Sequence, residues 1–310
     1  MLFVKNKTLA ALLAATGCHL IWGLSFMFSS KALEVASPLV LLGWRFIIAF
    51  LCINLLRLSP RVKIRFRKAD LKSLILLGLC EPVIYFLGEQ YGLLYTNSSF
   101  SGVMIALIPV VTIFAAIPFL KEKPTVGQVA FSLLSIAGVI VLALQNSSSG
   151  EIRPVGVLIL LVAVFSATAY SIINRKLSRS YTAFERCYFM MMTGCICFPI
   201  LALWENAADL SALIAPFRNE NFCISLLYLS TISSVGAYSM SSYATTHLPI
   251  SRTVIFANLT TAISVLAGVI FLGEPFTWLS GLCSLAIILG VWGAQRFAKP
   301  APVLPAPEKE

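Results

Sequence analysis

Charged side chains and histidine are scarce in this sequence. Only 12% of the 310 residues are charged and two are histidine, whereas 58% are hydrophobic. A soluble domain of this size needs more polar surface than that. The Walker A loop of nucleotide-binding proteins, the H-E-x-x-H motif of zinc proteases and the G-x-S-x-G motif of hydrolases are all missing. ATP-driven pumping by this chain alone and familiar hydrolytic chemistry are therefore unsupported.

The cysteines do not have the spacing of a metal centre. Most of the eight lie inside apolar stretches, and Cys195 and Cys197 form the only close pair. Neither His19 nor His247 is near that pair in the sequence, so the pattern typical of metal ligands is lacking. We interpret the cysteines as small apolar side chains within helices. The sequence predicts no metal site, no cofactor and no catalytic residue.

Long apolar runs dominate what is present. A helix needs about 20 apolar residues to cross a bilayer core, and the chain has room for about ten such spans. Short linkers indicate that neighbouring spans are antiparallel. The first run is longer than the apolar region of a signal peptide, so we expect it to be an uncleaved span. The predicted spans are Thr8–Ser30, Pro38–Leu56, Leu71–Tyr91, Ser98–Leu120, Val126–Leu144, Pro154–Ile173, Phe184–Trp204, Phe222–Thr245, Ile250–Leu272 and Trp278–Phe297.

Basic residues lie mainly in short segments between the apolar runs. The formal net charge is +10, which could suit nucleic acid. However, Lys and Arg concentrate in alternate linkers, as the positive-inside rule describes for membrane proteins. We therefore expect no nucleic-acid partner. The distribution predicts an all-α integral membrane protein with both termini in the cytoplasm.

One stretch of the sequence occurs twice. An offset of about 152 residues, without a gap, maps Ser99 onto Ser251, Leu107 onto Leu259, Glu122 onto Glu274, Thr125 onto Thr277 and Gly138 onto Gly290. Each copy has five predicted spans, an odd number, so the second copy enters the membrane upside down. The sequence predicts two inverted five-helix repeats, residues 1–147 and 148–299, and a disordered cytoplasmic tail, residues 300–310. Inverted repeats place a substrate site near the bilayer midplane and support alternating access.

Several motifs resemble those of a ten-span drug/metabolite transporter of the EamA type. They are W-G-x-S-F from Trp22, S-P-L-V-L-L-G-W-R-F from Ser37, the F-L-x-E corners at Glu122 and Glu274, and the glycines Gly138 and Gly290. The halves also differ, because Val129 stands opposite Gly281 and Thr261 opposite Pro109. The resemblance implies an inner-membrane carrier, often an exporter, with substrates that range from amino acids to drugs.

Glu81 is the strongest candidate for coupling transport to protons. It lies in the third predicted span, directly before Pro82. A carboxylate at that depth is costly unless it is protonated, paired or in contact with a wet cavity. Tyr85 and Glu89 follow at helical spacing, so a regular helix would place the three side chains on one face. They could line a translocation path, or Glu81 could be neutral and bonded to a neighbouring helix with Glu89 solvated near the outer surface.

Arg45 lies within the second span and needs a partner or an aqueous path. Glu34, Glu81 and Glu89 are the candidate partners, and the sequence does not choose among them. Arg45 could form a structural ion pair or contact the substrate. A pair between Arg45 and Glu81 would weaken the hypothesis that Glu81 carries a proton.

Other polar and aromatic side chains within spans are candidates for the cavity wall. His19 and Trp22 share a face of the first span, where Trp22 could stack on a flat or cationic ligand. Such groups can also join helices without binding a ligand. Spans eight and nine also offer Tyr238 and Thr260. The predicted cavity residues are His19, Trp22, Tyr85, Gln90, Tyr170, Asn174, Tyr243, Asn258 and Thr261; the coupling candidates are Glu81, Glu89 and Arg45.

Glu122 and Glu274 lie at predicted membrane faces. We expect helix-end packing or pairing with nearby loop charges at both corners. Pro82, Pro109, Pro118 and Pro199 interrupt spans and can produce static kinks or a gate.

The sequence as a whole predicts a secondary transporter for a small amino-acid-like or drug-like metabolite in the inner or plasma membrane. The resemblance alone favours export. Two alternatives stay open: an intramembrane enzyme acting on a lipid-linked substrate, and a channel or non-transporting membrane protein. The expected partners are a small-molecule substrate and the lipid bilayer. Ten spans can enclose a cavity in one chain, so a monomer suffices and a homodimer stays open.

Overall fold

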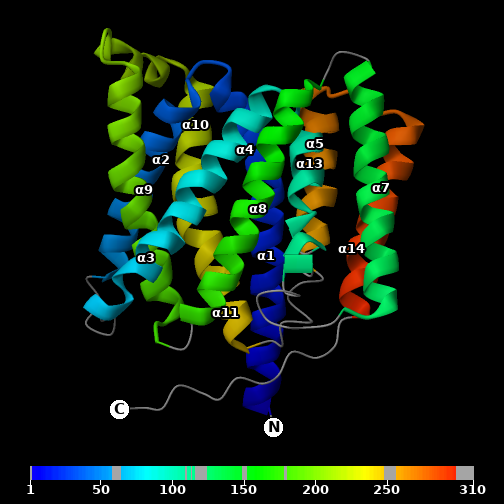
Figure 1. The fold of residues 1–310 in the computed structure, drawn as a ribbon. Helices are drawn as coiled ribbons and strands as arrows, with labels where there is room; N and C mark the ends of the chain where they lie inside the picture. The colour runs from blue at the N-terminus through cyan, green and yellow to red at the C-terminus, as the bar shows by residue number, and fades with distance from the viewer. Residues whose placement is uncertain are drawn as a thin grey trace.

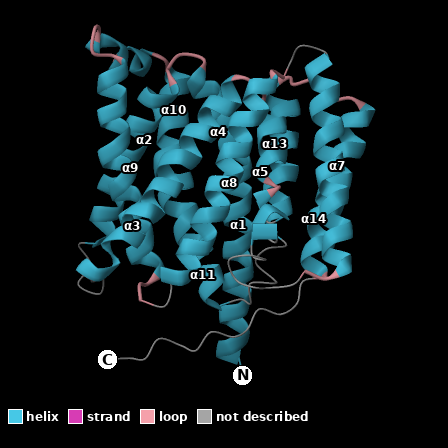
Figure 2. Ribbon diagram, viewed as in Figure 1, coloured by secondary structure: helices cyan, strands magenta, loops and turns pink. Residues whose placement is uncertain are grey.

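The structure is a computed structural model that describes residues 2–57, 64–108, 110–112, 114–115, 124–148, 152–177, 180–247 and 256–297. Within these ranges all regular elements are helices, and no strand is present (Figure 2). Glu122, Pro109, Pro118 and the predicted tail, residues 300–310, lie outside the described residues.

The helices of the N-terminal half begin at or before the starts of the predicted spans, and α5 covers only the first part of the predicted fourth span. They are α1 (Leu2–Leu33), α2 (Pro38–Arg57), the short 3-10 helix η1 (Lys68–Asp70), α3 (Leu71–Gly78), the π-helical η2 (Leu79–Ile84), α4 (Tyr85–Leu94), α5 (Ser98–Ile105) and α7 (Val126–Ser148). The elements α3, η2 and α4 together form one apolar segment, so the third span is continuous but irregular.

The described part of the C-terminal half is likewise built from helices. They are α8 (Pro154–Leu177), α9 (Ala183–Glu205), the 3-10 helices η3 (Leu210–Leu213) and η4 (Ala215–Arg218), α10 (Glu220–Leu227), the π-helical η5 (Tyr228–Ala237), α11 (Tyr238–His247), α13 (Ala257–Leu272) and α14 (Trp278–Arg296). The eighth span is thus built from α10, η5 and α11.

Length and apolar composition support membrane crossing. Six helical segments of the described chain are long and apolar enough to span a membrane, and four shorter apolar helices accompany them. Large apolar side chains such as Leu55, Leu158 and Ile270 are more than 60% exposed, as expected for a lipid-facing surface. The prediction of an all-helical, multi-span membrane protein is confirmed.

The helices pack side by side, with α1 in the interior of the bundle (Figure 1). The pair α2 and α9 lies at one edge, and the pair α7 and α14 lies at the opposite edge. Between them, α4 packs on α8 and α5 packs on α13. Figure 1 also shows that the start of α1 and the end of α14 lie at the same end of the bundle.

Two glycines allow α7 and α14 to approach closely. A Cβ atom on Gly138 would lie 2.8 Å from Ile287 Cγ1, and one on Gly290 would lie 2.6 Å from the Ser135 nitrogen. Small residues permit this kind of backbone approach in membrane helices. Gly138 and Gly290, like Ser135 and Ile287, are separated by the repeat offset of about 152 residues. The two helices therefore meet at positions that the predicted repeats make equivalent.

Candidate functional site

The third span is interrupted at the candidate coupling residue. Glu81 has an extended backbone (φ −143°, ψ 116°), and its peptide bond to Pro82 is cis. Ser166 of α8 donates a hydrogen bond to the Cys80 carbonyl oxygen at 2.7 Å, so this polar group is satisfied despite the break. Tyr85 and Glu89 both lie on the regular helix α4 at i and i+4, as expected, but Glu81 precedes that helix and does not share its regular backbone. Residues at helical spacing share a face only where the backbone turns by a constant angle per residue, and the extended backbone of Glu81 interrupts that turn.

The eighth span has a π-helical segment at the equivalent place. The repeat offset of about 152 residues carries η2, residues 79–84, onto residues 231–236, which lie inside η5. π-Helical turns occur frequently at functional sites. Discontinuous helices near the midplane hold substrates and ions in transporters built from inverted repeats. The η2 segment carries the predicted residue Glu81, and η5 carries Ser234, which contacts the predicted residue Arg45.

A chain of side-chain contacts starts at Glu81 and crosses four spans. Tyr238 of α11 donates a hydrogen bond of 2.5 Å to Glu81 Oε1. The Tyr238 ring makes an edge contact with Trp22 of α1, with the ring centroids 5.2 Å apart. Trp22 contacts His19 at 5.3 Å, and His19 Nδ1 lies 2.9 Å from Thr260 Oγ1 of α13. We call Glu81, Tyr238, Trp22, His19 and Thr260 the Glu81 chain.

A second group of contacts surrounds Arg45. Its side chain is 2% exposed, and Nε donates a hydrogen bond to Ser234 Oγ of η5 at 3.1 Å. The guanidinium lies 4.4 Å from the centre of the Phe86 ring. Of the three acidic residues considered from the sequence, Glu89 exerts the electrostatic effect on Arg45. The carboxylate of Glu81, in contrast, is bonded to Tyr238.

Glu89 and Gln90 of α4 extend this group toward α1. Gln90 Nε2 lies 2.9 Å from Glu89 Oε1 and 3.2 Å from Ser29 Oγ, and donates to both. We call Arg45, Ser234, Glu89, Gln90 and Ser29 the Arg45 cluster. Both Glu89 and Gln90 are buried, so the alternative of a solvated Glu89 near the outer surface is not what the structure shows.

Four of the predicted site residues carry buried polar atoms that have no hydrogen-bond partner. These atoms are Arg45 Nη1, Gln90 Oε1, Thr261 Oγ1 and Asn174 Oδ1. Most buried polar atoms in folded proteins have at least one partner, because leaving one unsatisfied is costly. The four residues lie on α2, α4, α13 and α8, and the hydroxyl oxygens of Ser98, Ser132 and Ser225 are likewise buried without a partner.

The remaining predicted residues differ in their placement. Tyr85 is buried beside Phe86, and the Tyr170 hydroxyl donates to Met190 Sδ at 3.2 Å. Tyr243 is 38% exposed on α11, so the structure does not bring it into the buried groups. Asn258 belongs to α13, but its side chain lies outside the described residues.

Tyr238, Ser234 and Ser25 support these groups but are absent from the predicted cavity residues. Tyr238 stood among the polar residues of the eighth span but was left out of the predicted cavity set. Ser234 was not singled out, and Ser25, whose hydroxyl donates to Ser233 Oγ at 2.8 Å, appeared only within the W-G-x-S-F motif. Four of the five residues from Ser230 to Ser234 are serine or threonine, and this was the available signal, since serine in a span often bonds a neighbouring helix.

At one end of the bundle, Glu274 of the second half contacts the start of α5 in the first half. Glu274, after α13, accepts hydrogen bonds from the backbone nitrogens of Ser98 and Ser99 at 2.7 and 2.9 Å. The Asn97 side chain accepts from the Phe100 nitrogen at 2.8 Å, so both residues cap α5. These contacts are the helix-end packing that we predicted for Glu274.

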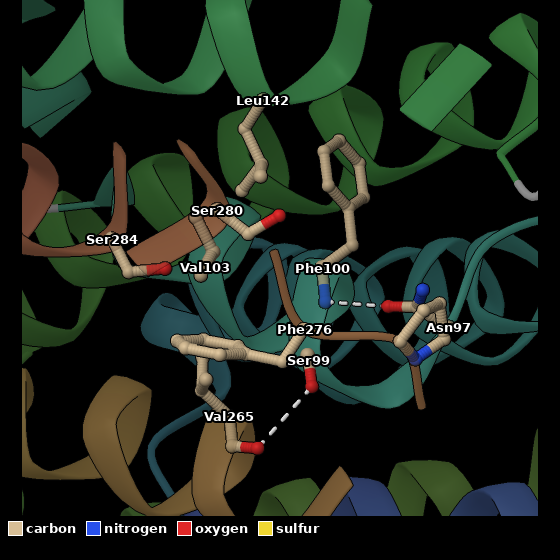
Figure 3. A pocket seen from close by; sticks show the side chains of 10 residues that line it. Asn97, Ser99, Phe100, Val103, Leu142, Val265, Phe276, Ser280 and Ser284 are labelled. Atoms are coloured by element: carbon tan, nitrogen blue, oxygen red, sulfur yellow. Dashed lines mark hydrogen bonds between the residues drawn. The ribbon is translucent and has the colours of Figure 1, made fainter. Parts of the chain in front are cut away.

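A small pocket beside this cap is too small for a metabolite (Figure 3). Its cavity volume is about 20 Å³. That is room for about one water molecule, whereas sites for small ligands have about 300 Å³ or more. Figure 3 shows the α5 residues Ser99 and Phe100 facing Phe276 and Ser280 from the second half. This pocket is therefore not a candidate substrate site.

The cysteines and acidic residues do not form a metal centre in the described part of the chain. No group of three or more His, Cys, Asp or Glu side chains is placed to hold a metal ion there. All eight cysteines are free thiols, four of them buried.

Comparison with known proteins assigns the chain to a family. The sequence profile of the EamA-like transporter family matches twice, at residues 9–144 and 154–294. An uncharacterized transporter of Bacillus subtilis, YcxC, is 31% identical over 94% of this chain and 94% of its own length. A protein of Streptantibioticus cattleyicolor named "Probable terminal-alkyne amino-acid exporter" is 23% identical over 72% of this chain and 73% of its own length.

The fold also has a match among solved structures. One crystal structure superposes with a TM-score of 0.65 and 16% sequence identity, covering 94% of this chain and 96% of the matched chain. At that identity the match supports the fold alone.

Proposed function

The chain belongs to the EamA-like transporter family, and from this premise we propose that it is a secondary transporter that exports a small amino-acid-like or drug-like metabolite by alternating access. The family assignment establishes a multi-pass membrane transporter. The substrate class, the direction of transport and its coupling are the proposed part. The Streptantibioticus relative named as an amino-acid exporter supports both the direction and the substrate class.

The observation that carries the proposal is the set of unsatisfied polar atoms in the interior. Arg45 Nη1, Gln90 Oε1 and Thr261 Oγ1 are buried without a partner on three different helices. A carrier for a polar metabolite must replace the hydration of its substrate with hydrogen bonds. Atoms of this kind supply such bonds when the substrate is present.

The irregular third and eighth spans support the proposal of alternating access. The η2 and η5 segments interrupt the third and eighth spans, and each contributes to one of the polar groups through Glu81 or Ser234. Irregular backbone inside a membrane is tolerated where it is buried in protein or lines a cavity. We assign alternating access to movement of the halves around these segments.

Proton coupling through Glu81 is consistent with its contacts. Glu81 is buried and accepts a hydrogen bond from Tyr238, whereas the electrostatic partner of Arg45 is Glu89. The absence of a hydrogen bond between Glu81 and Arg45 among the described residues supports the proton-carrier hypothesis. A carboxyl group bonded to a tyrosine hydroxyl can exist in either protonation state, and the Glu81 chain connects it to α1 and α13.

The distribution of basic residues supports the proposed orientation in a cell membrane. Arg57, Lys68, Lys72 and Arg296 lie at the ends of α2, η1, α3 and α14 that share one end of the bundle with the start of α1 (Figure 1). Cytoplasmic loops are rich in Lys and Arg. We assign this end to the cytoplasm and the end at which Glu274 caps α5 to the outside.

The test compares the medium of cells that express the parent protein with the medium of cells expressing a Trp22→Ala/Glu81→Gln double variant at equal abundance. We expect one metabolite class to accumulate outside only with the parent. A Glu34→Gln variant is the matched control, because Glu34 is exposed just after α1. Identical media from parent and double variant would contradict export of common metabolites.

A further inference from the structure

We propose that Arg45 binds the carboxylate of the transported substrate, so that the substrates are small monocarboxylic acids, with amino acids as the foremost class. The inference rests on the proposed transport function. It assigns to Arg45 a role in substrate recognition rather than in coupling or in a structural ion pair.

The guanidinium of Arg45 is fixed in position with one edge unused. Its Nε is bonded to Ser234, whose own hydroxyl donates to the Leu229 carbonyl oxygen at 2.8 Å. One face of the guanidinium lies on the Phe86 ring at 4.4 Å. Arginine offers five N–H donors in a planar fork that matches a carboxylate. With Nε occupied, the buried Nη1 donor remains without a partner.

The charge of Arg45 is also incompletely compensated. A guanidinium stays protonated in proteins, and a buried charge is costly unless it is paired and hydrogen-bonded. Glu89 exerts an attraction on Arg45, but its carboxylate oxygen is hydrogen-bonded by the Gln90 amide. Among the described residues, no carboxylate oxygen accepts a hydrogen bond from Arg45. A substrate carboxylate would supply both the missing acceptor and the missing negative charge.

The surroundings favour an anion with a single charge. Glu89 already places one carboxylate close enough to act on Arg45, so a doubly charged phosphate would meet more repulsion than a carboxylate. An α-amino acid carries an ammonium group next to its carboxylate, and the negative charge of Glu89 near Arg45 favours a ligand that carries such a positive group. These features make amino acids the first probes to use.

The experiment measures binding to the purified full-length protein in lipid nanodiscs. Each of the twenty common L-amino acids is screened for stabilisation against heat, because a ligand that binds the folded state raises the unfolding midpoint. For the most stabilising amino acid, the dissociation constants of the free acid and of its carboxamide are then compared. We expect the parent to bind the acid at least tenfold more tightly than the amide.

Variants of Arg45 separate recognition from a structural role. Arg45→Gln should bring the ratio of acid to amide affinity close to one, and Arg45→Lys should restore part of it by keeping the charge without the fork. A merely structural Arg45 would weaken binding of both ligands equally and leave the ratio unchanged. Arg218→Gln is the matched control, because Arg218 is an exposed arginine in η4. If Arg45→Gln does not fold, Ser234→Ala, which removes the acceptor that holds Nε, should lower the ratio instead.

Several results would overturn the assignment. It fails if no amino acid shifts the midpoint, if inorganic phosphate binds more tightly than every amino acid, or if Arg45→Gln keeps the preference for the acid. In each case, a metabolite that is still secreted by the parent alone would leave the transport function intact. Loss of transport as a whole is detected separately by the comparison of media.

Discussion

Replacing Glu274 by alanine should destabilise the contact that joins the two halves at the outer end. Glu274 accepts hydrogen bonds from the Ser98 and Ser99 nitrogens, and Asn97 accepts one from the Phe100 nitrogen. The Ser101 nitrogen is bonded to the Asn97 carbonyl oxygen. All four backbone donors at the start of α5 are therefore satisfied, two of them by Glu274. Alanine would leave those two without a protein acceptor.

The magnitude follows from the number and kind of bonds lost. Removal of a helix cap costs about 1 kcal/mol, and loss of a negative charge at a helix N-terminus adds up to about 1 kcal/mol. Glu274 is half-buried, so water would replace part of what is lost. We expect the free energy of unfolding to fall by about 2 kcal/mol, which corresponds to a Tm about 4 °C lower for a chain of this size class.

A glycine beside Glu274 provides an independent check. A Cβ atom on Gly268 would overlap Glu274 Oε2 and Ser99 Oγ, so Gly268→Ala should displace the carboxylate and the serine hydroxyl. Combined with Glu274→Ala, the glycine substitution should cost less than it does alone, because the overlap with the carboxylate is gone and only the overlap with Ser99 Oγ remains.

The assay is thermal unfolding of purified protein, followed by intrinsic fluorescence. Glu34→Ala serves as the control, since an exposed glutamate outside a cap should change the free energy of unfolding by less than about 0.5 kcal/mol. A Tm for Glu274→Ala within about 1 °C of the parent would refute the cap argument. If the losses in free energy of unfolding caused by Glu274→Ala and Gly268→Ala simply add in the double variant, the contact between residues 268 and 274 is refuted.

Three further outcomes are expected. Glu81→Gln should abolish accumulation driven by a pH gradient in proteoliposomes while substrate exchange continues; accumulation that persists under the gradient rules Glu81 out as the proton carrier. Tyr238→Phe removes one hydrogen bond to Glu81 and should shift the pH dependence of exchange without loss of folding, whereas an unchanged pH profile would separate Tyr238 from coupling. Gly290→Ala should lower the free energy of unfolding by about 1 to 3 kcal/mol, because its Cβ meets the α7 backbone, and an unaltered Tm would show that the two helices can separate freely.

Fold class could be predicted because it depends on local properties of the chain. Apolar runs of bilayer length determine that the chain forms membrane helices, since backbone polar groups in lipid must bond within their own segment. The apolar run of the third span did not, however, predict the non-helical backbone at Glu81. Pro82 signalled an interruption, but the extended conformation of Glu81 depends on α8, where Ser166 satisfies the Cys80 carbonyl oxygen.

Single buried polar residues of the candidate site could be predicted from the sequence, but the contacts between them could not. Burial of Arg45, Glu81 and Glu89 follows from their positions in apolar runs, so the sequence identified them. The bond from Tyr238 to Glu81 joins residues 157 positions apart, and only the packing of the eighth span against the third brings them together. Arg45 likewise had three possible acidic partners, and the crossing of α2 and η5 decided that Ser234 holds its Nε.

The sequence by itself determined that the chain is helical, crosses the membrane many times, and carries a few costly polar groups in its spans. Hydropathy, length and repeat spacing are enough for this, because each acts within one segment. The tertiary structure alone decided which polar groups meet, which atoms remain without a partner, and that Glu274 of one half caps α5 of the other. Those outcomes depend on how helices distant in the chain pack, and a contact between two helices is a property of both surfaces together.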